Sequence, residues 1–524
     1  MQLPEIAIII IDCVLVARLL FSKVRLHVEV FPLFAVGCLI LLLGFVLDGL
    51  RWQMIPAWFV FFVLSACSLS SKNPHVIWRG LAAVPLLLFL GLSAFLSHQL
   101  PIFDLPSPSG PYSVGTFDTQ LVDQSRIERF NPTSNRELGM AIWYPSNSDG
   151  INSLERASLW ESLYTGDWDL VKFFTHYLSK IKTSSYKGAP IAQDKIFPVV
   201  IFNHGMTAWP EQNTVLVEQL ASHGYVVVSI AHTYQSTRVQ TKSSGKVLFT
   251  SKIPDDLGIE ELDENGNYRS TFGVISQKAL ENGQEYSLLF EELYKLYEQY
   301  ISSGSEDAKR ALVVNAIKNR ERYRIGSTAT ADNLYNLFYG RMTAMGSYVD
   351  TWVEDIQFVL NQLAVMDTPL ENFNAALDLE RVAILGHSIG GSAAGEFCKT
   401  DSRCKAGVQL DGNYSGFKWD TPLRAPFMTF YSTYFFEGNN FAYLRSENDL
   451  WNYTHPNLDH MDFTDLALAV PNLTAPGMSG TIDGHLALNM VNDVTLAFLD
   501  RYLKNQPRSL EVFNLYPELV SRKY

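Results

Sequence analysis

A serine flanked by glycines lies at residues 386–390, in the pentapeptide GHSIG. The β-rich run Arg381–Leu385 leads directly into it, and the small residues at positions 391–395 suit a tightly packed helix. A strand, a sharp turn and a helix in this order present a serine hydroxyl at the top of a sheet, and the glycines avoid steric conflict in the turn. Ser388 is therefore the predicted nucleophile of an acyl-transfer reaction.

A serine hydroxyl is a poor nucleophile unless a histidine accepts its proton and an acid orients that histidine. After a serine turn of this kind, the acid and then the histidine follow along the chain. Asp411 is the favoured acid, because it ends the apolar run Ala406–Leu410 and so lies at the sheet edge beside Ser388. Asp420 and Asp449 are the alternatives, and neither follows such a strand.

Three histidines, His455, His460 and His485, could supply the base. His460 lies in a loop after the run Trp451–Thr454, and His485 lies in a glycine-rich turn before the last predicted helix, Ala487–Leu503. Position along the chain favours His460 but leaves the other two histidines open.

An oxyanion hole needs N–H groups that face the reacting carbonyl oxygen. One should come from the residue after the nucleophile, Ile389, and another from the loop after an early strand. The predicted strand Val199–Phe202 leads into the loop Asn203–Met206, so the N–H of Met206 is the second predicted donor. For His204 in the same loop, a structural role that holds the loop in shape is favoured over a catalytic one.

Short β-rich runs alternate with helical patterns from about residue 113 onward, which predicts the α/β class with a mostly parallel sheet flanked by helices. Together with the serine turn, this alternation indicates an α/β-hydrolase. The clearest predicted strands are Met140–Tyr144, Val199–Phe202, Tyr225–Ile230, Val382–Leu385, Ala406–Leu410 and Phe427–Tyr431, and the predicted helices between them are Val215–Ser222, Trp352–Leu363 and Ser392–Cys398.

The alternation stops between Ile230 and Trp352. An insertion of this length, at about residues 236–350, is expected to form a helical cap over the carboxyl edge of the sheet. Its clearest helical stretches are Leu288–Ile301 and Ala308–Arg320.

Apolar residues crowd the first hundred positions. A helix needs roughly 20 apolar residues to cross a membrane, and residues 5–22, 30–50, 54–70 and 80–97 approach or reach that length. The sequence therefore predicts a transmembrane segment of about four helices at residues 1–99, a Pro-rich linker at 100–112 and a hydrolase domain at 113–524.

Basic residues in short loops predict the orientation of these spans, because they favour the cytoplasmic side. Arg18, Lys23 and Arg25 lie between the first two spans, and Lys72 and Arg79 lie between the last two. Both ends of the segment should therefore face away from the cytoplasm, which places the hydrolase domain outside a cell membrane.

Apolar residues also recur at helical spacing across residues 169–182, with Lys172, His176 and Lys180 on the other side. This predicts an amphipathic helix. It either packs on the core or lies in a lipid interface.

The charge pattern argues against a nucleic-acid partner, because the net charge is −13 and the basic residues form no long cluster. No metal or cofactor is expected. The stretch Asp263–Val274 resembles the start of a calcium loop, but Tyr268 and Val274 stand where glycine and glutamate are needed. Cys398 and Cys404 could form a disulfide in an oxidising compartment or remain thiols.

The chain resembles the secreted type of platelet-activating factor acetylhydrolase and its bacterial relatives. The resemblance lies in Phe197–Gly205 (FPVVIFNHG) with Ala221–Tyr225 (ASHGY), Val382–Gly391 (VAILGHSIGG), Gly407–Gly412 (GVQLDG) and His460–Asp465 (HMDFTD). It spans roughly residues 113–505 and implies Ser388, Asp411 and His460 as the catalytic triad. It thereby strengthens His460 over the other histidines. Val171–Lys182 resembles the helix by which this family meets lipid.

These features predict a membrane-anchored serine esterase that hydrolyses short-chain or oxidised acyl esters of phospholipids, as the resemblance implies. A carboxylesterase for non-lipid or polymeric esters is the alternative, for which the cap would shape a different pocket. A non-catalytic membrane sensor on a hydrolase fold is a third hypothesis, and it predicts that a fluorophosphonate probe does not label Ser388.

Overall fold

The structure of the chain is a computed structural model. It describes residues 2–21, 27–48, 51–69, 76–147, 151–193, 195–243, 245–250, 331–412, 421–432, 446–471, 478–506, 515–516 and 518–523. The chain divides into two compact units. The helical unit comprises Met1–Leu105, Ser158–Lys182 and Leu468–Leu473, and the sheet unit comprises Pro106–Ala157, Thr183–Ala467 and Thr474–Tyr524. The helical unit thus includes two segments from within the range predicted for the hydrolase domain.

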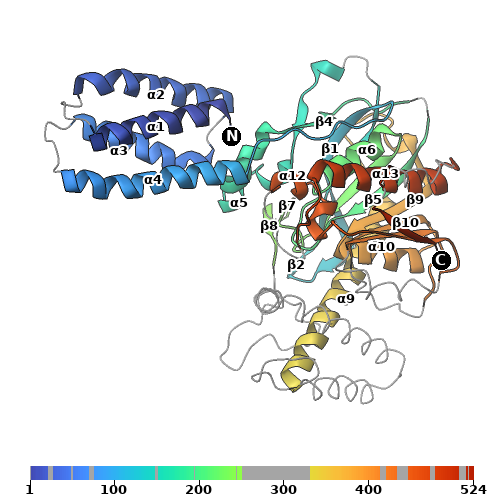
Figure 1. Cartoon of the computed structure of the whole chain (residues 1–524). Helices are drawn as coiled ribbons and strands as arrows, with labels where there is room; N and C mark the ends of the chain where they lie inside the picture. The colour runs from blue at the N-terminus through green and yellow to red at the C-terminus, as the bar shows by residue number, and fades with distance from the viewer. Residues whose placement is uncertain are drawn as a thin grey trace. The chain divides into compact units, whose positions relative to one another are not determined.

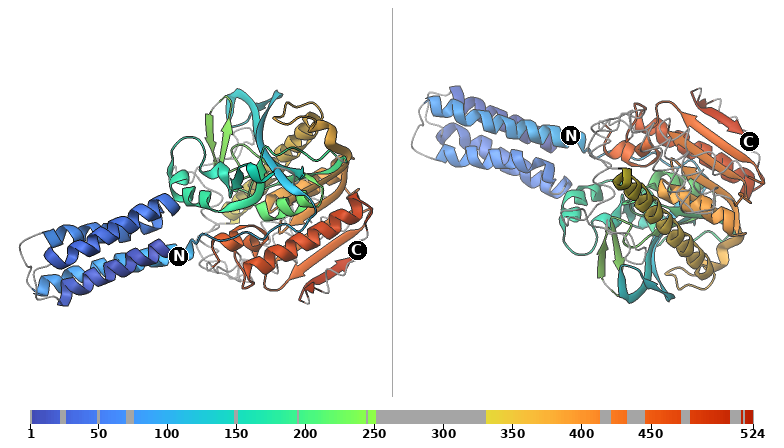
Figure 2. Two further views of the ribbon diagram at one scale, coloured as in Figure 1. Left: turned by 90° about the horizontal axis from the view of Figure 1, so that it is seen from above. Right: turned by 90° about the horizontal axis from the view of Figure 1, so that it is seen from below.

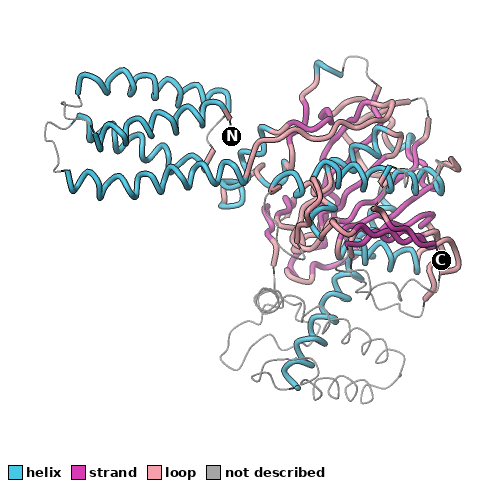
Figure 3. Tube along the Cα trace, in the orientation of Figure 1, coloured by secondary structure: helices cyan, strands magenta, loops and turns pink. Residues whose placement is uncertain are grey.

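The described part of the first hundred residues forms four α-helices, which are labelled in Figure 1 and drawn in cyan in Figure 3. They are α1 (Leu3–Phe21), α2 (His27–Asp48), α3 (Ile55–Leu69) and α4 (Val76–Gln99). Among the residues that the structure describes, one apolar helix, Arg79–Gln99, has the length needed to cross a membrane, and the apolar stretches Pro32–Phe45 and Trp52–Cys67 are shorter. Helices therefore occur at the positions of all four predicted spans. Among the described residues, Arg79–Gln99 is the one helix that is both apolar enough and long enough to cross a membrane.

Apolar side chains fill the centre of this bundle. Ile8 of α1, Phe61 of α3 and Leu90 of α4 are almost completely buried. Near them, Nη1 of Arg51 donates to Oε1 of Glu5 at 2.7 Å, and both side chains are buried. Burying either charge without the other would be costly, so this pair ties the start of α1 to the connection before α3.

The predicted helix at residues 169–182 is shorter than expected. α5 (Leu170–Thr175) ends halfway, and the chain continues as a 3-10 turn at His176–Lys180. The indole N–H of Trp52 donates to the carbonyl of Phe174 at 2.9 Å. This segment therefore packs within the helical unit.

The described strands form a mixed eleven-stranded sheet in the order β13-β12-β11-β10-β9-β5-β6-β2-β1-β4-β3. The strands are β1 (Ser113–Glu128), β2 (Asn131–Ser146), β3 (Arg156–Ser158), β4 (Lys182–Lys187), β5 (Phe197–Asn203), β6 (Val226–Ala231), β9 (Leu377–His387), β10 (Cys404–Leu410), β11 (Phe427–Ser432), β12 (Leu450–His455) and β13 (Val520–Lys523). Neighbouring strands from β12 to β6 are parallel, whereas β2 and β13 join them as antiparallel partners. The predicted parallel centre is confirmed, and each of the six predicted strands overlaps an observed one.

Helices cover both faces of the sheet unit (Figure 2). They are α6 (Thr214–Ser222), α9 (Ala331–Gln362), α10 (Ile389–Thr400) and α13 (Gly484–Leu503). Alternate residues of a strand point to opposite faces. Val199 and Ile201 of β5 accordingly share one core cluster with Trp352 of α9, whereas Val200 and Phe202 share the other with α6 and α13. A central strand buried on both faces explains the continuous apolar run seen in the sequence.

The region predicted as a helical cap begins with a β-hairpin that was not predicted. β7 (Arg238–Thr241) pairs antiparallel with β8 (Gly245–Leu248). α9 starts at Ala331, inside the predicted insertion, and continues through most of the predicted helix Trp352–Leu363. The helical stretches predicted at Leu288–Ile301 and Ala308–Arg320 lie outside the described residues.

A disulfide closes the connection between α10 and β10. It joins Cys398 to Cys404, whose Cα atoms are 5.1 Å apart, and both side chains are buried. The bond joins the last turn of α10, the helix that follows Ser388, to the first residue of β10. It therefore holds the end of that helix close to the sheet.

We expect the double substitution of Cys398→Ala and Cys404→Ala to lower the free energy of unfolding by about 2 kcal/mol, because a cross-link removes conformational freedom from the unfolded chain. The thermal midpoint of wild type and variant, each with and without reductant, measures the effect. Reductant should lower the midpoint of wild type and leave the variant unchanged. Equal midpoints for oxidised and reduced wild type would contradict a stabilising disulfide.

Candidate active site

Ser388 lies at the junction of β9 and α10, with backbone φ of 56° and ψ of −124°. A non-glycine residue in this region is strained and persists only where its surroundings hold it. The N–H of Ser388 donates to the carbonyl of Leu410 at 2.9 Å. A side chain at Gly386 would collide with the backbone of Gly390, and one at Gly390 would collide with the carbonyl of Asn203. The turn therefore has the form of a nucleophile elbow.

Asp411 leaves the sheet beside Ser388. Leu410 pairs with His387 in the parallel register of β10 and β9, so the residues that follow them leave adjacent strands at the same level. The Asp411 side chain is completely buried. Its Oδ2 lies 2.7 Å from Nδ1 of His460, and its Oδ1 accepts a hydrogen bond from the N–H of Ser432 at 2.6 Å.

His460 begins a 3-10 turn at residues 460–463 and leaves 15% of its side chain exposed. Its ring can therefore be reached from outside the core while Nδ1 faces the buried carboxylate. The structure thus brings Asp411 and His460, the acid and the base favoured by their order along the chain, into contact.

The other candidate acids and bases lie elsewhere. The Asp449 carboxylate accepts from the Tyr502 hydroxyl at 2.6 Å, and Asp420 lies outside the described residues. His455 is buried at the end of β12, and His485 is exposed in the first turn of α13.

Across the described residues, no three His, Cys, Asp or Glu side chains are grouped as ligands for a metal ion.

The loop after β5 runs against the serine turn. A Cβ placed on Gly205 would lie 3.5 Å from Cβ of Ser388. The N–H of Gly205 donates to Oε1 of Gln212 at 2.8 Å, and the N–H of Thr207 donates to the carbonyl of Gln235 at 2.9 Å. The N–H groups on either side of Met206 are therefore occupied.

Met206 and Ile389 remain the candidate oxyanion donors. Met206 is half-buried in the loop next to Ser388. Ile389 is the first residue of α10, and the first N–H groups of a helix have no acceptor within it. Both N–H groups thus belong to segments that border the serine.

His204 supports this loop from the inside. Its buried ring donates through Nδ1 to the carbonyl of Gly205 at 2.6 Å. Its Nε2 accepts from the Ser236 hydroxyl at 2.6 Å and from the N–H of His232 at 3.3 Å. Burial lowers the pKa of His204 to about 3, so the ring is neutral. These contacts agree with the structural role expected for His204.

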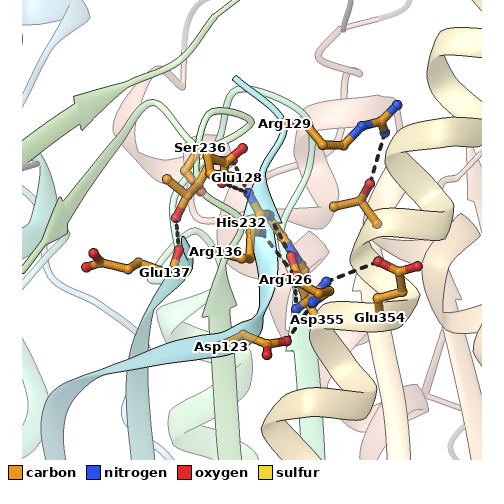
Figure 4. Close-up of polar contacts among 12 residues, drawn as sticks. Asp123, Arg126, Glu128, Arg129, Arg136, Glu137, His232, Ser236, Glu354 and Asp355 are labelled. Atoms are coloured by element: carbon orange, nitrogen blue, oxygen red, sulfur yellow. Dashed lines mark hydrogen bonds and ion pairs between the residues drawn. The ribbon is translucent and has the colours of Figure 1, made fainter. Parts of the chain in front are cut away.

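A buried charge network lies behind the loop (Figure 4). Oδ2 of Asp355, on α9, is 2.6 Å from Nη2 of Arg136 and 2.9 Å from Nδ1 of His232. Arg136 also contacts Glu128 at 2.8 Å, and Nε2 of His232 lies 3.1 Å from Oδ1 of Asn203. Although burial opposes ionisation, Arg136 holds the pKa of Asp355 well below its usual range. The network connects α9 and β2 to the last residue of β5, just before the loop.

Two further residues of the site, Gln212 and His387, were not predicted to take part. His387 lies inside the GHSIG pentapeptide, so its position next to Ser388 was a signal that could have been used. Gln212 lies 175 residues before His387, and no motif marks it. Its amide Nε2 is 3.0 Å from Nδ1 of His387, a contact that only the folded chain reveals.

A sheet with a parallel centre, helices on both faces and a strained serine turn after a central strand defines the α/β-hydrolase fold. A ferulic acid esterase from Streptomyces cinnamoneus has the same fold. Its solved structure matches with a TM-score of 0.54 and 21% sequence identity, and the match covers 80% of this chain and 99% of that one.

The sequence identifies the family within this fold. The model of platelet-activating factor acetylhydrolase, isoform II, matches residues 99–270 and 351–511. Similar proteins include the platelet-activating factor acetylhydrolases of Cavia porcellus, 24% identical over 76% of this chain and 78% of that protein, and of Canis lupus familiaris, 21% identical over 76% and 77%. The chain belongs to the platelet-activating factor acetylhydrolase, isoform II, family and is a carboxylic ester hydrolase. The matched ranges leave out residues 271–350, which lie within the predicted insertion.

We expect the buried histidines of the site to make the folded state less stable in acid. Burial lowers the pKa of His204 to about 3, and burial together with the neighbouring His460 holds the pKa of His387 well below its ordinary value. In the unfolded chain both histidines bind protons near pH 6.5, at roughly their unperturbed pKa. The unfolded state then binds more protons than the folded state below that pH, so stability falls as the pH decreases from about 7 to about 5.

Thermal midpoints at these pH values measure the effect. The decrease in thermal midpoint between pH 7 and pH 5 should be smaller in His204→Gln, which lacks one of the titrating rings. It should be the same as in wild type in His485→Gln, which alters an exposed ring. Equal pH dependence in wild type and His204→Gln would show that this histidine does not contribute.

Proposed function

We propose that this enzyme hydrolyses short-chain or oxidised acyl esters of phospholipids through a covalent acyl-Ser388 intermediate. The observation that carries the proposal is the contact of 2.7 Å between Oδ2 of Asp411 and Nδ1 of His460, at the sheet edge that carries Ser388. A carboxylate at this distance keeps the proton on Nδ1, so Nε2 is the nitrogen that accepts the serine proton.

In the proposed reaction, His460 takes the proton of Ser388 as Oγ attacks the ester carbonyl. The carbonyl oxygen becomes an oxyanion that the N–H groups of Met206 and Ile389 stabilise, and each such donor contributes about 3 kcal/mol. His460 then protonates the leaving alcohol as its bond to the acyl carbon breaks. A water molecule, deprotonated by His460, attacks the acyl enzyme, releases the carboxylic acid and restores Ser388. Asp411 stays ionised and stabilises the imidazolium.

The substrate class rests on the family and on the helical unit. The relatives named above are platelet-activating factor acetylhydrolases, which supports a short acyl group on a phospholipid. In the helical unit, Trp168 and Leu170 at the start of α5 are more than two thirds exposed, and Phe174 is 45% exposed. Exposed aromatic and apolar residues of this kind favour contact with a lipid interface.

We further propose that the helical unit anchors the enzyme in a cell membrane, with the sheet unit outside the cytoplasm. The outward side chains of a water-soluble bundle are mainly polar. Here many outward side chains of the first four helices are large and apolar, among them Leu3, Ile10, Phe21, Leu39, Leu42, Phe59, Leu81, Leu88 and Phe95. The apolar length of Arg79–Gln99 supports the same proposal. The basic residues of the connecting loops support the orientation.

A carboxylesterase for non-lipid or polymeric esters is the second candidate. Two observations favour it. One matching solved structure is a ferulic acid esterase, and residues 271–350 have no match in the family model, so the family resemblance does not extend to this part of the predicted insertion. This alternative keeps the same three catalytic side chains and differs in substrate.

We expect Ser388→Ala to abolish hydrolysis and fluorophosphonate labelling. Asp411→Asn should lower kcat by about 10⁴-fold, because the amide favours the wrong histidine tautomer. Asp449→Asn is the matched control, since its carboxylate contacts Tyr502 and Lys523, and it should change kcat little.

Rates on a short-acyl phospholipid and on a water-soluble aryl ester measure both the mechanism and the substrate class. Aryl ester turnover without any phospholipid turnover would replace the first substrate class by the second. Equal losses in Asp411→Asn and Asp449→Asn would reject Asp411 as the acid.

We expect the full chain to stay with the membrane pellet after extraction at alkaline pH, because apolar helices cannot leave the hydrocarbon core. In intact cells, an external protease should cleave the sheet unit, with a cytoplasmic enzyme as the protected control. Complete protection of the sheet unit would reverse the proposed orientation, and release of the chain by alkali would contradict anchoring.

A further inference from the structure

A chain of hydrogen bonds connects the loop next to Ser388 to the loop that carries His460. The N–H of Gly205 donates to Oε1 of Gln212 at 2.8 Å. Nε2 of Gln212 lies 3.0 Å from Nδ1 of His387, and Nε2 of His387 lies 3.0 Å from the carbonyl oxygen of His460. The two segments that meet here are the predicted oxyanion loop and the loop of the predicted base.

The backbone groups at the two ends of this series of hydrogen bonds determine which side-chain atoms between them donate and which accept. A backbone N–H can only donate, so Gln212 must turn its Oε1 to Gly205 and its Nε2 to His387. A backbone carbonyl can only accept, so His387 must carry its proton on Nε2 and accept on Nδ1. Only the neutral ring satisfies all three bonds. Burial and the nearby His460 hold the pKa of His387 well below its usual range, in agreement with this geometry.

Both linking side chains are buried. Gln212 is 2% exposed and His387 is 1% exposed. Removing one of these side chains leaves a buried polar atom of the other without its hydrogen bond, which is costly unless the substitute supplies the same bond. The His387 ring also packs against the His460 ring, with centroids 4.6 Å apart and planes inclined at 37°. Movement of His387 would therefore be transmitted to His460 through both a hydrogen bond and ring packing.

The backbone around Gln212 is bound to the same loop. The N–H of Asp465 donates to the carbonyl of Gln212 at 3.2 Å, and the amide of Asn213 donates to the carbonyl of Phe463 at 2.6 Å. Gln212 is thus held on the His460 side, while its side chain reaches Gly205.

We propose that Gln212 and His387 are positioning residues that hold the oxyanion loop and His460 in one fixed relation to Ser388. This inference rests on the proposed function of Ser388 and His460. Neither residue touches the reacting atoms in the proposed mechanism. Their effect is on geometry, and a small displacement of catalytic groups is sufficient to slow acyl transfer.

The test uses isosteric and conservative variants of the whole chain. His387→Phe keeps the ring and removes both hydrogen bonds, and Gln212→Met keeps the length and removes its two bonds. Each should lower kcat about tenfold while KM changes less than about twofold, because the geometry of reaction is altered and the substrate contacts are not. His387→Gln should recover most of kcat, since its amide can both accept from Gln212 and donate to the His460 carbonyl.

Gln219→Met is the matched control. Gln219 is also buried and bonds a distant residue, Ser109, so its loss should affect stability without the same loss of kcat. If His387→Phe does not fold, His387→Asn carries the same comparison, because it keeps an acceptor for Gln212 and lacks the reach to His460. That variant is also expected to lose kcat about tenfold.

Two results would overturn the inference: an unchanged kcat in the folded His387 variants that break the bond, or an equal loss of kcat in His387→Gln and His387→Phe. Ser388→Ala is measured beside them. Activity that persists in Ser388→Ala refutes the proposed function itself. Loss of activity in Ser388→Ala with normal kcat in the His387 variants refutes only the positioning role.

Discussion

The backbone of Ser388 is held at a positive φ that non-glycine residues rarely adopt, and a conformation of this kind costs about 1–3 kcal/mol. This conformation persists because contacts with the neighbouring strands hold the backbone of Ser388 in place. Ser388 is bonded to the carbonyl of Leu410 on the next strand, and the glycines at 386 and 390 let the turn approach its own helix and the end of β5. The parallel register of β9 and β10 then places Asp411 beside the serine. The site thus depends on three strands keeping one register.

Electrostatics divide the site into a core of fixed charge and a set of neutral rings. Arg136, Asp355 and Glu128 form a buried network in which each charge has a partner. Such networks are costly to bury but rigid once every member is satisfied. His204 and His387 are neutral because burial lowers their pKa values. Neutral imidazoles can accept and donate at once, which lets them connect loops without adding charge beside His460.

The helical unit and the sheet unit differ in the kinds of residue that they expose and in their proposed roles. Every group that we assign to the chemistry belongs to the sheet unit. Among its described residues the helical unit combines a buried apolar core with many large apolar side chains on its outside, and this is the observation behind the proposed membrane anchor. The matched range of the family starts at residue 99, so the first helices lie outside the part of this chain that resembles its relatives.

The sequence by itself determined the central strands of the sheet and the nucleophile turn. Continuous apolar runs such as Val199–Phe202 identify buried parallel strands, and the glycines around Ser388 identify the elbow, because both are dictated by local sterics and burial. The antiparallel edges, the hairpin β7–β8 and the early end of α5 were not predicted, since edge strands alternate weakly and short helices depend on their neighbours. The sequence also selected Asp411 and favoured His460, but it left His455 and His485 open. Only the tertiary structure showed which ring faces the Asp411 carboxylate and connected Gln212 to His387 across 175 residues. Contacts between residues far apart along the chain depend on how the strands and loops pack, and no local pattern encodes them.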